Sequence, residues 1–317
     1  MANTQKIGDT VSQEDIKTYK PDLDFRLKLE IGGANVTIAD NYYKRNEGLD
    51  IDFNIIKTNE SVAQESIIKI YNLSNKTYNL IYEKGKSFRL SCARGEKEEY
   101  TPFYTGYSVS TKKVGGKTII TSNEGFMKQD ANAGRRGQTD FPTEIVLRSY
   151  GQAQIFKSYQ SSVSTDMIIE DCRKALGLPK GNIDKINSVI KPKGYTIKGD
   201  VAKCLNTLGK QLNFTWNCND MNFNIYNKNN SDYKVYAVKL NGNNSNTPER
   251  QTDEFIVKGV KKQGFKIETM LLPFLQVGAT CVLDFDISGA NGSKYIYRLE
   301  HSGTNTGTEC KTIIYCV

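Results

Sequence analysis

Histidine is almost absent from this 317-residue sequence, whose only one is His301. A Ser-His-Asp or Cys-His nucleophile would have to use this residue, and no Gly-x-Ser-x-Gly turn presents a serine to it. A histidine-based zinc site needs two or three such ligands, which excludes that chemistry. We therefore expect His301 to be a structural residue near the end of a strand.

Other catalytic and membrane signals are also missing. The sequence contains neither of the glycine-rich phosphate-binding patterns, G-x-x-x-x-G-K-[ST] and G-x-G-x-x-G. No apolar run approaches the roughly 20 residues of a membrane-spanning helix, and residues 1–10 lack the apolar core of a signal peptide. None of the seven cysteines forms a C-x-x-C pair, so we expect buried free thiols. We predict no enzymatic activity, no cofactor, no metal, and synthesis in a cytoplasm.

What the chain has is positive charge, with a formal net charge of +8. Such a charge can indicate a nucleic-acid surface. The lysines are scattered among Asn, Asp and Glu, however, and the densest basic stretch is the short loop Gly134–Gly137. We favour a solvated surface.

Two pairs of acidic residues have strand spacing. Asp284 and Asp286 are two residues apart, as are Asp50 and Asp52, so each pair shares one face of a strand. A glycosidase needs two carboxylates about 5 to 10 Å apart in a cleft. Paired acids on a strand are more often solvated, and we favour that interpretation, with a channel-lining face as an alternative.

The first half of the chain divides into an arm and a β-rich unit. Residues 1–22 show no apolar period and are interpreted as an arm. Residues 23–160 are predicted to form a β unit, because apolar and polar residues alternate at 25–31, 51–55 and 66–71. One short helix is expected after Ser74, and Gly115-Gly116 is expected to turn a hairpin.

Residues 161–228 are predicted to form a small α+β unit. Ser164 and Asp200 are placed to cap two amphipathic helices, and a hairpin is expected to turn at Asn219-Asp220. The helix faces predicted to be buried are Ile169, Cys172 and Leu176, then Val201, Leu205, Leu208 and Leu212. Residues 229–317 return to strands after Asn-rich stretches interpreted as loops or a linker. The fold class is mainly β: two β units around a small α+β unit.

The most informative stretch runs from Gly259 to Asp286. It predicts a strand, an apolar bend, a tight turn and a second strand. The bend is too apolar for an ordinary solvated loop. It is either a contact between subunits or a segment folded over its own barrel, and its residues are Leu271, Leu272, Pro273, Phe274 and Leu275.

Three stretches resemble phage tail baseplate hub proteins, which are related to the spike-base domains of type VI secretion. The first is Ile67–Ser74, a strand ending in Tyr-Asn-Leu-Ser. The second is Lys193–Trp216, with a glycine, a capped helix with paired leucines, and a strand carrying Trp216. The third is the 259–286 stretch with its closing hairpin from Tyr295 to Gly307. Together they occur in the family's order over residues 25–317.

The resemblance implies two tail-tube-like antiparallel β-barrel domains in each chain. Three chains would form a pseudo-sixfold ring that joins the tail tube, or an adaptor, to a central spike, and DNA would pass through it unread. A tape measure protein is a further candidate partner, and the protein would belong to the virion. Two alternatives stay open: a carbohydrate- or cell-wall-binding module with Trp216 as the glycan contact, and a β-rich nucleic-acid-binding protein.

Overall fold

The structure is a computed structural model. It describes residues 16–18, 25–32, 36–39, 49–58, 65–71, 73–82, 86–94, 100–114, 142–148, 150, 153–160, 162–184, 186, 190–191, 194–219, 222–227, 237–257, 260–287, 289–304 and 310–317. The predicted Gly115-Gly116 hairpin turn and the basic loop Gly134–Gly137 lie outside the described residues, as does most of the arm.

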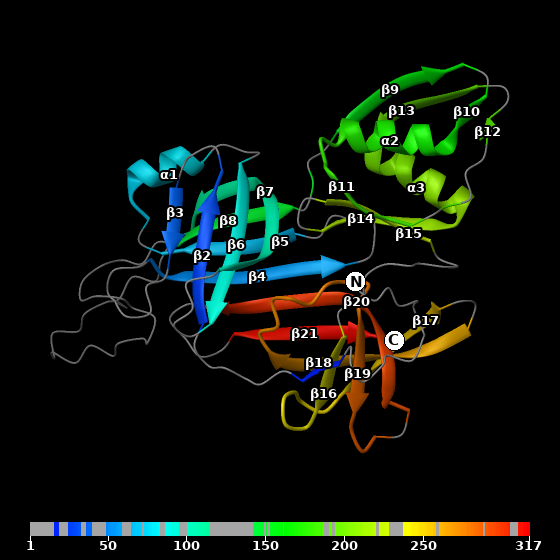
Figure 1. Cartoon of the computed structure of the whole chain (residues 1–317). Coiled ribbons are helices and arrows are strands. Elements are labelled where there is room, and N and C mark those ends of the chain that lie inside the picture. The colour runs from blue at the N-terminus through cyan, green and yellow to red at the C-terminus, as the bar shows by residue number, and fades with distance from the viewer. Residues whose placement is uncertain are drawn as a thin grey trace, which may run out of the picture.

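The first β unit is antiparallel and lies at the left of Figure 1. Its strands alternate between buried and exposed side chains, as the sequence predicts, and the buried ones form one core. The elements are β2 (Phe25–Ile31), β3 (Val36–Ala39), β4 (Ile51–Thr58), β5 (Glu65–Ile70), α1 (Asn75–Ile81), β6 (Ser87–Arg94), β7 (Thr101–Lys113) and β8 (Thr143–Arg148). The hydroxyl of Ser74 accepts a hydrogen bond from the backbone N–H of Thr77, which confirms the predicted cap of α1.

The second β unit is built mainly from the end of the chain and has its own core. Its strands are β16 (Ala237–Asn241), β17 (Glu249–Val257), β18 (Val260–Met270), β19 (Thr280–Asp284), β20 (Gly292–Thr304) and β21 (Lys311–Cys316). A short strand of the arm, β1 (Ile16–Thr18), joins this unit by pairing in parallel with β16. Residues from both ends of the chain therefore share one sheet.

The small α+β unit lies at the upper right of Figure 1 and has a third core. Its elements are β9 (Gln154–Tyr159), β10 (Val163–Ser164), α2 (Thr165–Ala175), β11 (Lys180–Ile183), β12 (Ile190–Lys191), β13 (Tyr195–Asp200), α3 (Val201–Leu212), β14 (Phe214–Asn219) and β15 (Asn222–Asn227). Ser164 and Asp200 cap α2 and α3, and β14 pairs with β15 as the predicted hairpin. Strand β9 pairs with β13, so we propose that this unit begins before residue 154 rather than at 161.

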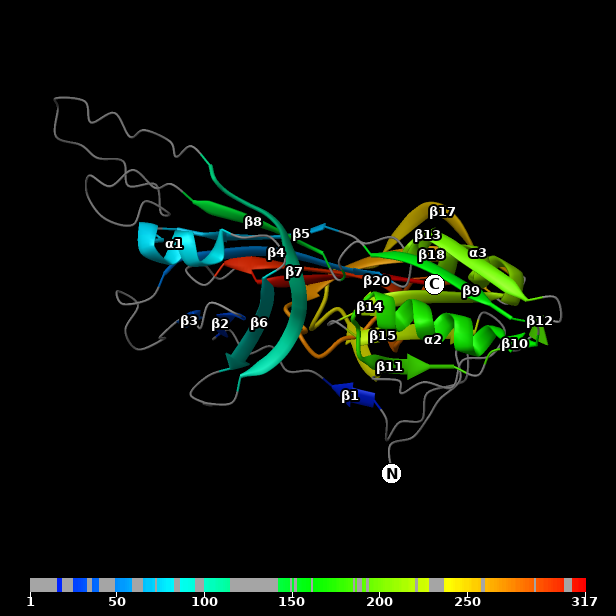
Figure 2. The same cartoon turned by 90° about the horizontal axis from the view of Figure 1, so that it is seen from above.

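The two β units are joined by one continuous sheet. Strands β4 and β20 pair antiparallel over seven residues, from Thr58 opposite Arg298 to Asp52 opposite Thr304. Around this joint eight strands follow one another in the order β17, β18, β21, β20, β4, β5, β8, β7, and each neighbouring pair is antiparallel. Figure 2 shows β4 and β20 side by side at the centre of the molecule.

The Asn-rich stretch at 241–246 is an ordered turn and not a linker. Its side chains bond the local backbone: Asn244 Oδ1 accepts from the N–H of Asn241, and Asn241 Oδ1 accepts from the N–H of Asn243. Ser245 then forms a bridge to Thr269 on β18. The short amide side chains thus close a turn between β16 and β17, which is a common use of asparagine.

Candidate functional site

Pairs of opposite charge cover the exposed face of the eight-stranded sheet. Three pairs lie on the first unit: Lys112 Nζ to Glu144 Oε1 at 3.0 Å, Lys69 Nζ to Glu144 Oε2 at 4.0 Å, and Arg148 Nη2 to Glu65 Oε1 at 2.7 Å. Three lie on the second unit: Arg298 Nη2 to Glu300 Oε1 at 2.6 Å, Lys311 Nζ to Glu268 Oε2 at 3.0 Å, and Lys266 Nζ to Glu249 Oε2 at 3.4 Å. Such exposed pairs each contribute about 0 to 1 kcal/mol, so stability alone does not account for their concentration here.

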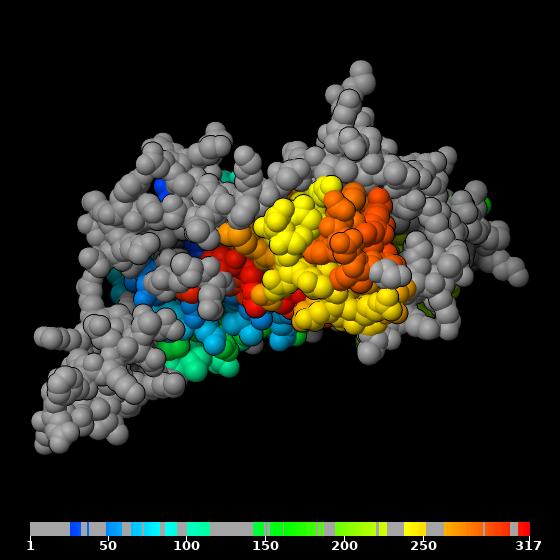
Figure 3. Space-filling view, turned by 90° about the horizontal axis from the view of Figure 1, so that it is seen from below, coloured from blue at the N-terminus to red at the C-terminus, as the bar shows by residue number. Residues whose placement is uncertain are grey.

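Side chains without charge fill the space between these pairs. Ile67 lies opposite Val146, and Asn54 lies opposite both Ile67 and Ser302, so one row crosses the joint between the units. One further acidic residue, Asp52, lies on the same face, where its carboxylate accepts a hydrogen bond from the hydroxyl of Tyr71 at 2.7 Å. In Figure 3 the red surface near the middle adjoins the blue surface below it, and the blue-green surface follows at the lower edge, so both units contribute to one surface.

The eight-stranded sheet has two edges that no described strand covers. At one end β17 pairs only with β18, and at the other the stretch of β7 after Ser108 pairs only with β8. Seven antiparallel pairings separate the two edges, so β7 and β17 run in opposite directions. Long free edges present unpaired N–H and C=O groups, and they invite pairing with another chain.

The apolar bend at 271–275 lies between the two β units of its own chain. Leu271 is fully buried in the first core, whereas Leu272 and Leu275 are fully buried in the second. The N–H of Leu271 donates to the carbonyl of Cys310, and that of Leu272 donates to the hydroxyl of Thr312. Pro273 is buried as well, and Phe274 is partly buried against the second core.

This placement corresponds to the second of the two expectations for the bend, a segment folded over its own chain. Leu271, Leu272 and Leu275 expose no surface in the single chain, and the assignment of the bend to a subunit interface stays a prediction. Of the five residues, only Phe274 retains exposed surface for a contact between chains, and that contact stays a prediction.

His301 lies in the joint itself, on β20 opposite Ile55 of β4. Its ring is completely buried, with Nδ1 2.9 Å from the hydroxyl of Thr312 and no described partner at Nε2. Burial lowers the pKa of the imidazole to about 3, and the nearby Lys57 contributes to the shift. A neutral, enclosed imidazole is consistent with the predicted structural role.

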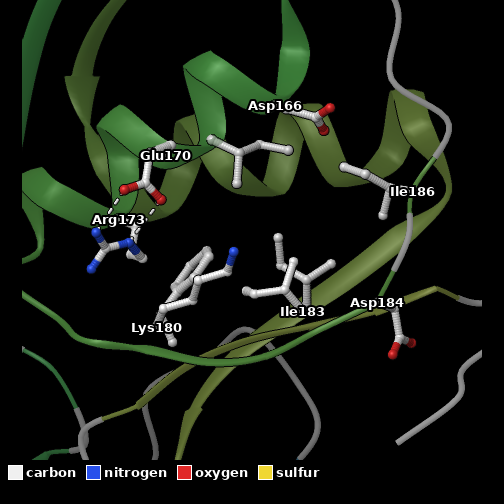
Figure 4. A pocket seen from close by; sticks show the side chains of 10 residues that line it. Asp166, Glu170, Arg173, Lys180, Ile183, Asp184 and Ile186 are labelled. Carbon is white, nitrogen blue, oxygen red and sulfur yellow. Dashed lines mark hydrogen bonds and ion pairs between the residues drawn. The ribbon is translucent and has the colours of Figure 1, made fainter.

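A hollow of about 760 Å³ opens on the α+β unit between α2 and β11. Its apolar lining comes from both sheet and helix and includes Ile169, Ile183 and Phe223. Figure 4 shows charged side chains around it, with Glu170 and Arg173 held together by hydrogen bonds. This ion pair lowers the pKa of Glu170, which keeps the carboxylate charged. The lining combines no nucleophile with a base, so we assign it no chemistry.

Trp216, the proposed glycan contact of the alternative interpretation, lies in the core of the α+β unit. It is 1% exposed, its indole N–H donates to Asn206 Oδ1 at 2.8 Å, and its ring packs beside Tyr150 and Phe223. A glycan-stacking tryptophan needs an exposed ring face. In this structure Trp216 has none.

The thiols and the acid pairs show no catalytic arrangement. Burial raises the pKa of Cys92 and Cys172 to about 12 and that of Cys310 to about 11, so these thiols stay protonated. Asp284 is exposed and paired with Lys239 at 2.6 Å. Within the described part of the chain, no group of three or more His, Cys, Asp or Glu residues is placed to hold a metal ion. Nor does any described helix have the length and hydropathy to span a membrane.

No protein-family model and no curated protein sequence matches the chain. Several solved structures do match the chain. A 43 kDa tail protein of prophage MuSo2 from Shewanella oneidensis matches with a TM-score of 0.59 and 11% identity, over 93% of this chain and 97% of that one. A tail protein from Neisseria meningitidis matches with a TM-score of 0.57 and 9% identity, over 92% of this chain and 96% of that one.

A third structure links the fold to secretion. It is an E. coli component of the type VI secretion system, described as structurally similar to the T4 bacteriophage tail proteins gp27 and gp5. It matches with a TM-score of 0.57 and 9% identity, over 92% of this chain and 76% of that one. The chain therefore has the mainly β fold of these phage tail and secretion proteins, as the resemblance in its sequence indicates.

Proposed function

We propose that this chain is a structural protein of a phage tail, a baseplate hub whose task is assembly and not catalysis. The observation that carries the proposal is the joint between β4 and β20. It makes the two β units into one rigid eight-stranded wall with a free edge at each end. The shared fold with tail proteins over more than nine tenths of the chain supports it.

The geometry of the wall suits a ring. Because β7 and β17 run in opposite directions, β17 of one copy can lie antiparallel to β7 of the next, and the same contact then repeats around the ring. A head-to-tail contact of this kind either closes or forms a filament. The hub resemblance implies three chains, whose six β units would give the pseudo-sixfold symmetry of a tail tube.

The proposed partners follow from this position. One rim of the ring would meet the tail tube or an adaptor, the other would hold the central spike, and the hole would admit DNA. The tape measure protein would share the channel before ejection. The ring would be assembled in the host cytoplasm and belong to the virion.

Neither alternative function has a described set of residues to carry it. The buried ring of Trp216 removes the basis for the glycan-binding module. The basic loop that motivated nucleic-acid binding lies outside the described residues, and the largest exposed face of the sheet has balanced charges.

The test is the mass of the purified protein in solution, measured by light scattering over a range of concentrations, followed by negative-stain imaging. Three-chain particles with a central hole are the expected result. If the protein stays a monomer at the highest concentration and also in the presence of its spike protein, the hub proposal is wrong. A glycan screen of that monomer would then be the next step.

A further inference from the structure

We infer that the exposed face of the eight-stranded sheet lines the channel, and that its ion pairs make this wall electrically balanced, so that DNA passes without being held. The inference rests on the proposed ring. It goes further by naming the residues of the wall and by stating the property that suits them to their cargo.

The position of the second layer of structure decides which face points inward. One side of the sheet is covered by the cores of both β units, together with the strands that close over them. In Figure 2, β2, β6 and β1 all lie on the same side of the joined β4 and β20. When a sheet curls into a ring, the face with the additional layer needs the larger circumference, so the uncovered face belongs inside.

The charges on the uncovered face cancel among the side chains that the structure describes there. The basic ones are Lys69, Lys112, Arg148, Lys266, Arg298 and Lys311, and the acidic ones are Asp52, Glu65, Glu144, Glu249, Glu268 and Glu300. Each of the basic residues has an acidic partner within 4.0 Å. The chain as a whole carries +8, so its excess positive charge lies elsewhere.

A balanced wall has a definite consequence for a polyanion. Unpaired Lys and Arg bind DNA by replacing the counterions of the phosphates, whereas a cation already held by a carboxylate must give up that partner first. A strongly negative wall would repel the DNA instead. The paired face therefore offers a threading duplex neither a binding site nor a barrier.

The experiment unbalances the face. The variant combines Glu65→Gln, Glu144→Gln, Glu268→Gln and Glu300→Gln, which leaves their basic partners unpaired. A matched control neutralises four acids that are paired elsewhere on the protein: Glu30→Gln (with Lys28), Asp171→Asn (with Lys157), Glu170→Gln (with Arg173) and Asp284→Asn (with Lys239). Both proteins gain the same charge, and circular dichroism and light scattering check that each folds and assembles like the wild type.

The readout is the affinity for short linear duplex DNA as a function of salt. We expect negligible binding by the wild type. The face variant should bind at low salt, with a log–log salt slope steeper by about five, roughly one for each of the five cations set free, because Glu144 is the partner of both Lys69 and Lys112. The control should gain much less. Equal affinities of the two variants, no gain by the face variant, or tight salt-dependent binding by the wild type would each overturn the inference.

A second comparison tests whether the face lies inside the ring. Linear DNA can thread through a closed ring, whereas covalently closed circular DNA cannot, so the face variant should retain only the linear form. Equal retention of both forms by trimeric rings would place the face outside, and would leave the hub proposal intact. Monomers would contradict the hub proposal instead, so the two failures can be told apart by the mass of the particle.

If the fourfold variant does not fold, the two changes on the first unit, Glu65→Gln and Glu144→Gln, are made alone. Their matched control is then Glu170→Gln with Asp171→Asn. These two changes free Arg148, Lys69 and Lys112, so the expected change in salt slope falls to about three, and the same outcomes decide.

Discussion

The first β unit has two neighbours in its own chain, and it is attached to them in different ways. It shares a seven-residue ladder with the second β unit, and Leu271 and Cys310, from that unit's part of the chain, lie in its core. Its contacts with the α+β unit are side-chain contacts: Asn217 Nδ2 donates to the carbonyl of Thr58 at 3.1 Å, and Tyr107 packs against the third core. The two β units thus behave as one body, whereas the α+β unit is a module docked on it.

The largest effect is expected where the bend passes between the two β cores. Leu272→Asp together with Phe274→Asp places charge against an apolar core, a cost that exceeds the usual stability of a domain, so the protein should be insoluble. The soluble fraction after expression measures this. Leu80→Asp with Tyr82→Asp, on exposed side chains of the first unit, is the matched control and should stay soluble. A soluble monomer from the bend variant would instead place the bend between subunits. It would contradict the conclusion that the bend holds the two β units of one chain together.

The next effect should stay within the α+β unit. Trp216→Ala removes its largest buried side chain and should cost about 3 to 5 kcal/mol in that unit. Hydrogen exchange should show loss of protection in α2, α3, β14 and β15, with β4 and β20 unchanged. Trp216→Phe, which keeps most of the ring, should lose less. If β4 and β20 lose protection equally, all three units unfold as one and the distinction is wrong.

Acid should loosen the joint between the β units through His301. Burial, with Lys57 nearby, lowers the pKa of the folded imidazole to about 3 from its ordinary value of 6.5. As the pH falls from 6.5 to 3, His301 therefore becomes protonated in the unfolded state but stays neutral in the folded state. Over this window stability should fall as the pH falls, by roughly 1 kcal/mol per pH unit at most from this residue.

The measurement is urea unfolding at several pH values for the wild type and for His301→Gln, whose amide can still bond Thr312. The variant should lose this part of the pH dependence and keep the part that comes from carboxylates. Identical pH profiles would show that His301 does not sense acid in the joint.

The smallest effect is expected at the docking contact of the α+β unit. Asn217→Ala removes the hydrogen bond to the carbonyl of Thr58 and one of the hydrogen bonds of the Asn224 amide, which should cost about 1 to 3 kcal/mol. Since Trp216 is the only tryptophan, its fluorescence follows the α+β unit alone, whereas hydrogen-exchange protection of β4 and β20, measured as a function of temperature, follows the β units. The two melting curves should separate further in the variant than in the wild type. Coincident curves would mean that the units unfold together.

Local patterns in the sequence predicted the local structure well. Alternation located β2, β4 and β5, and the hydroxyl and carboxylate caps of Ser74, Ser164 and Asp200 were confirmed, because a strand or a cap depends on residues close in the chain. The buried positions on the two long helices were also confirmed for Ile169, Cys172, Val201, Leu205 and Leu208.

The joint and the charged face could not be predicted in this way. The pairing of β4 with β20 joins residues from opposite ends of the chain, and no local period encodes which two strands meet. The ion pairs on the face depend on that register, so the sequence indicated only scattered charge. The role of Trp216 could not be predicted for a different reason. A tryptophan in a strand gives the same sequence pattern whether its ring packs in a core or contacts a ligand.

The joint also constrains how the protein is made. Thr58 pairs with Arg298, so a ribosome that has finished β4 must add about 240 residues before its partner strand exists. At roughly 5 to 20 residues per second, the inner edge of β4 stays open for about 12 to 50 s in every round of translation. During that interval the nascent chain exposes a strand edge with unpaired N–H and C=O groups. The core of the first β unit also still lacks Leu271. Slow codons between those for β4 and β20 would lengthen this interval and so reduce the yield of native protein, whereas slow codons before β4 would not lengthen it.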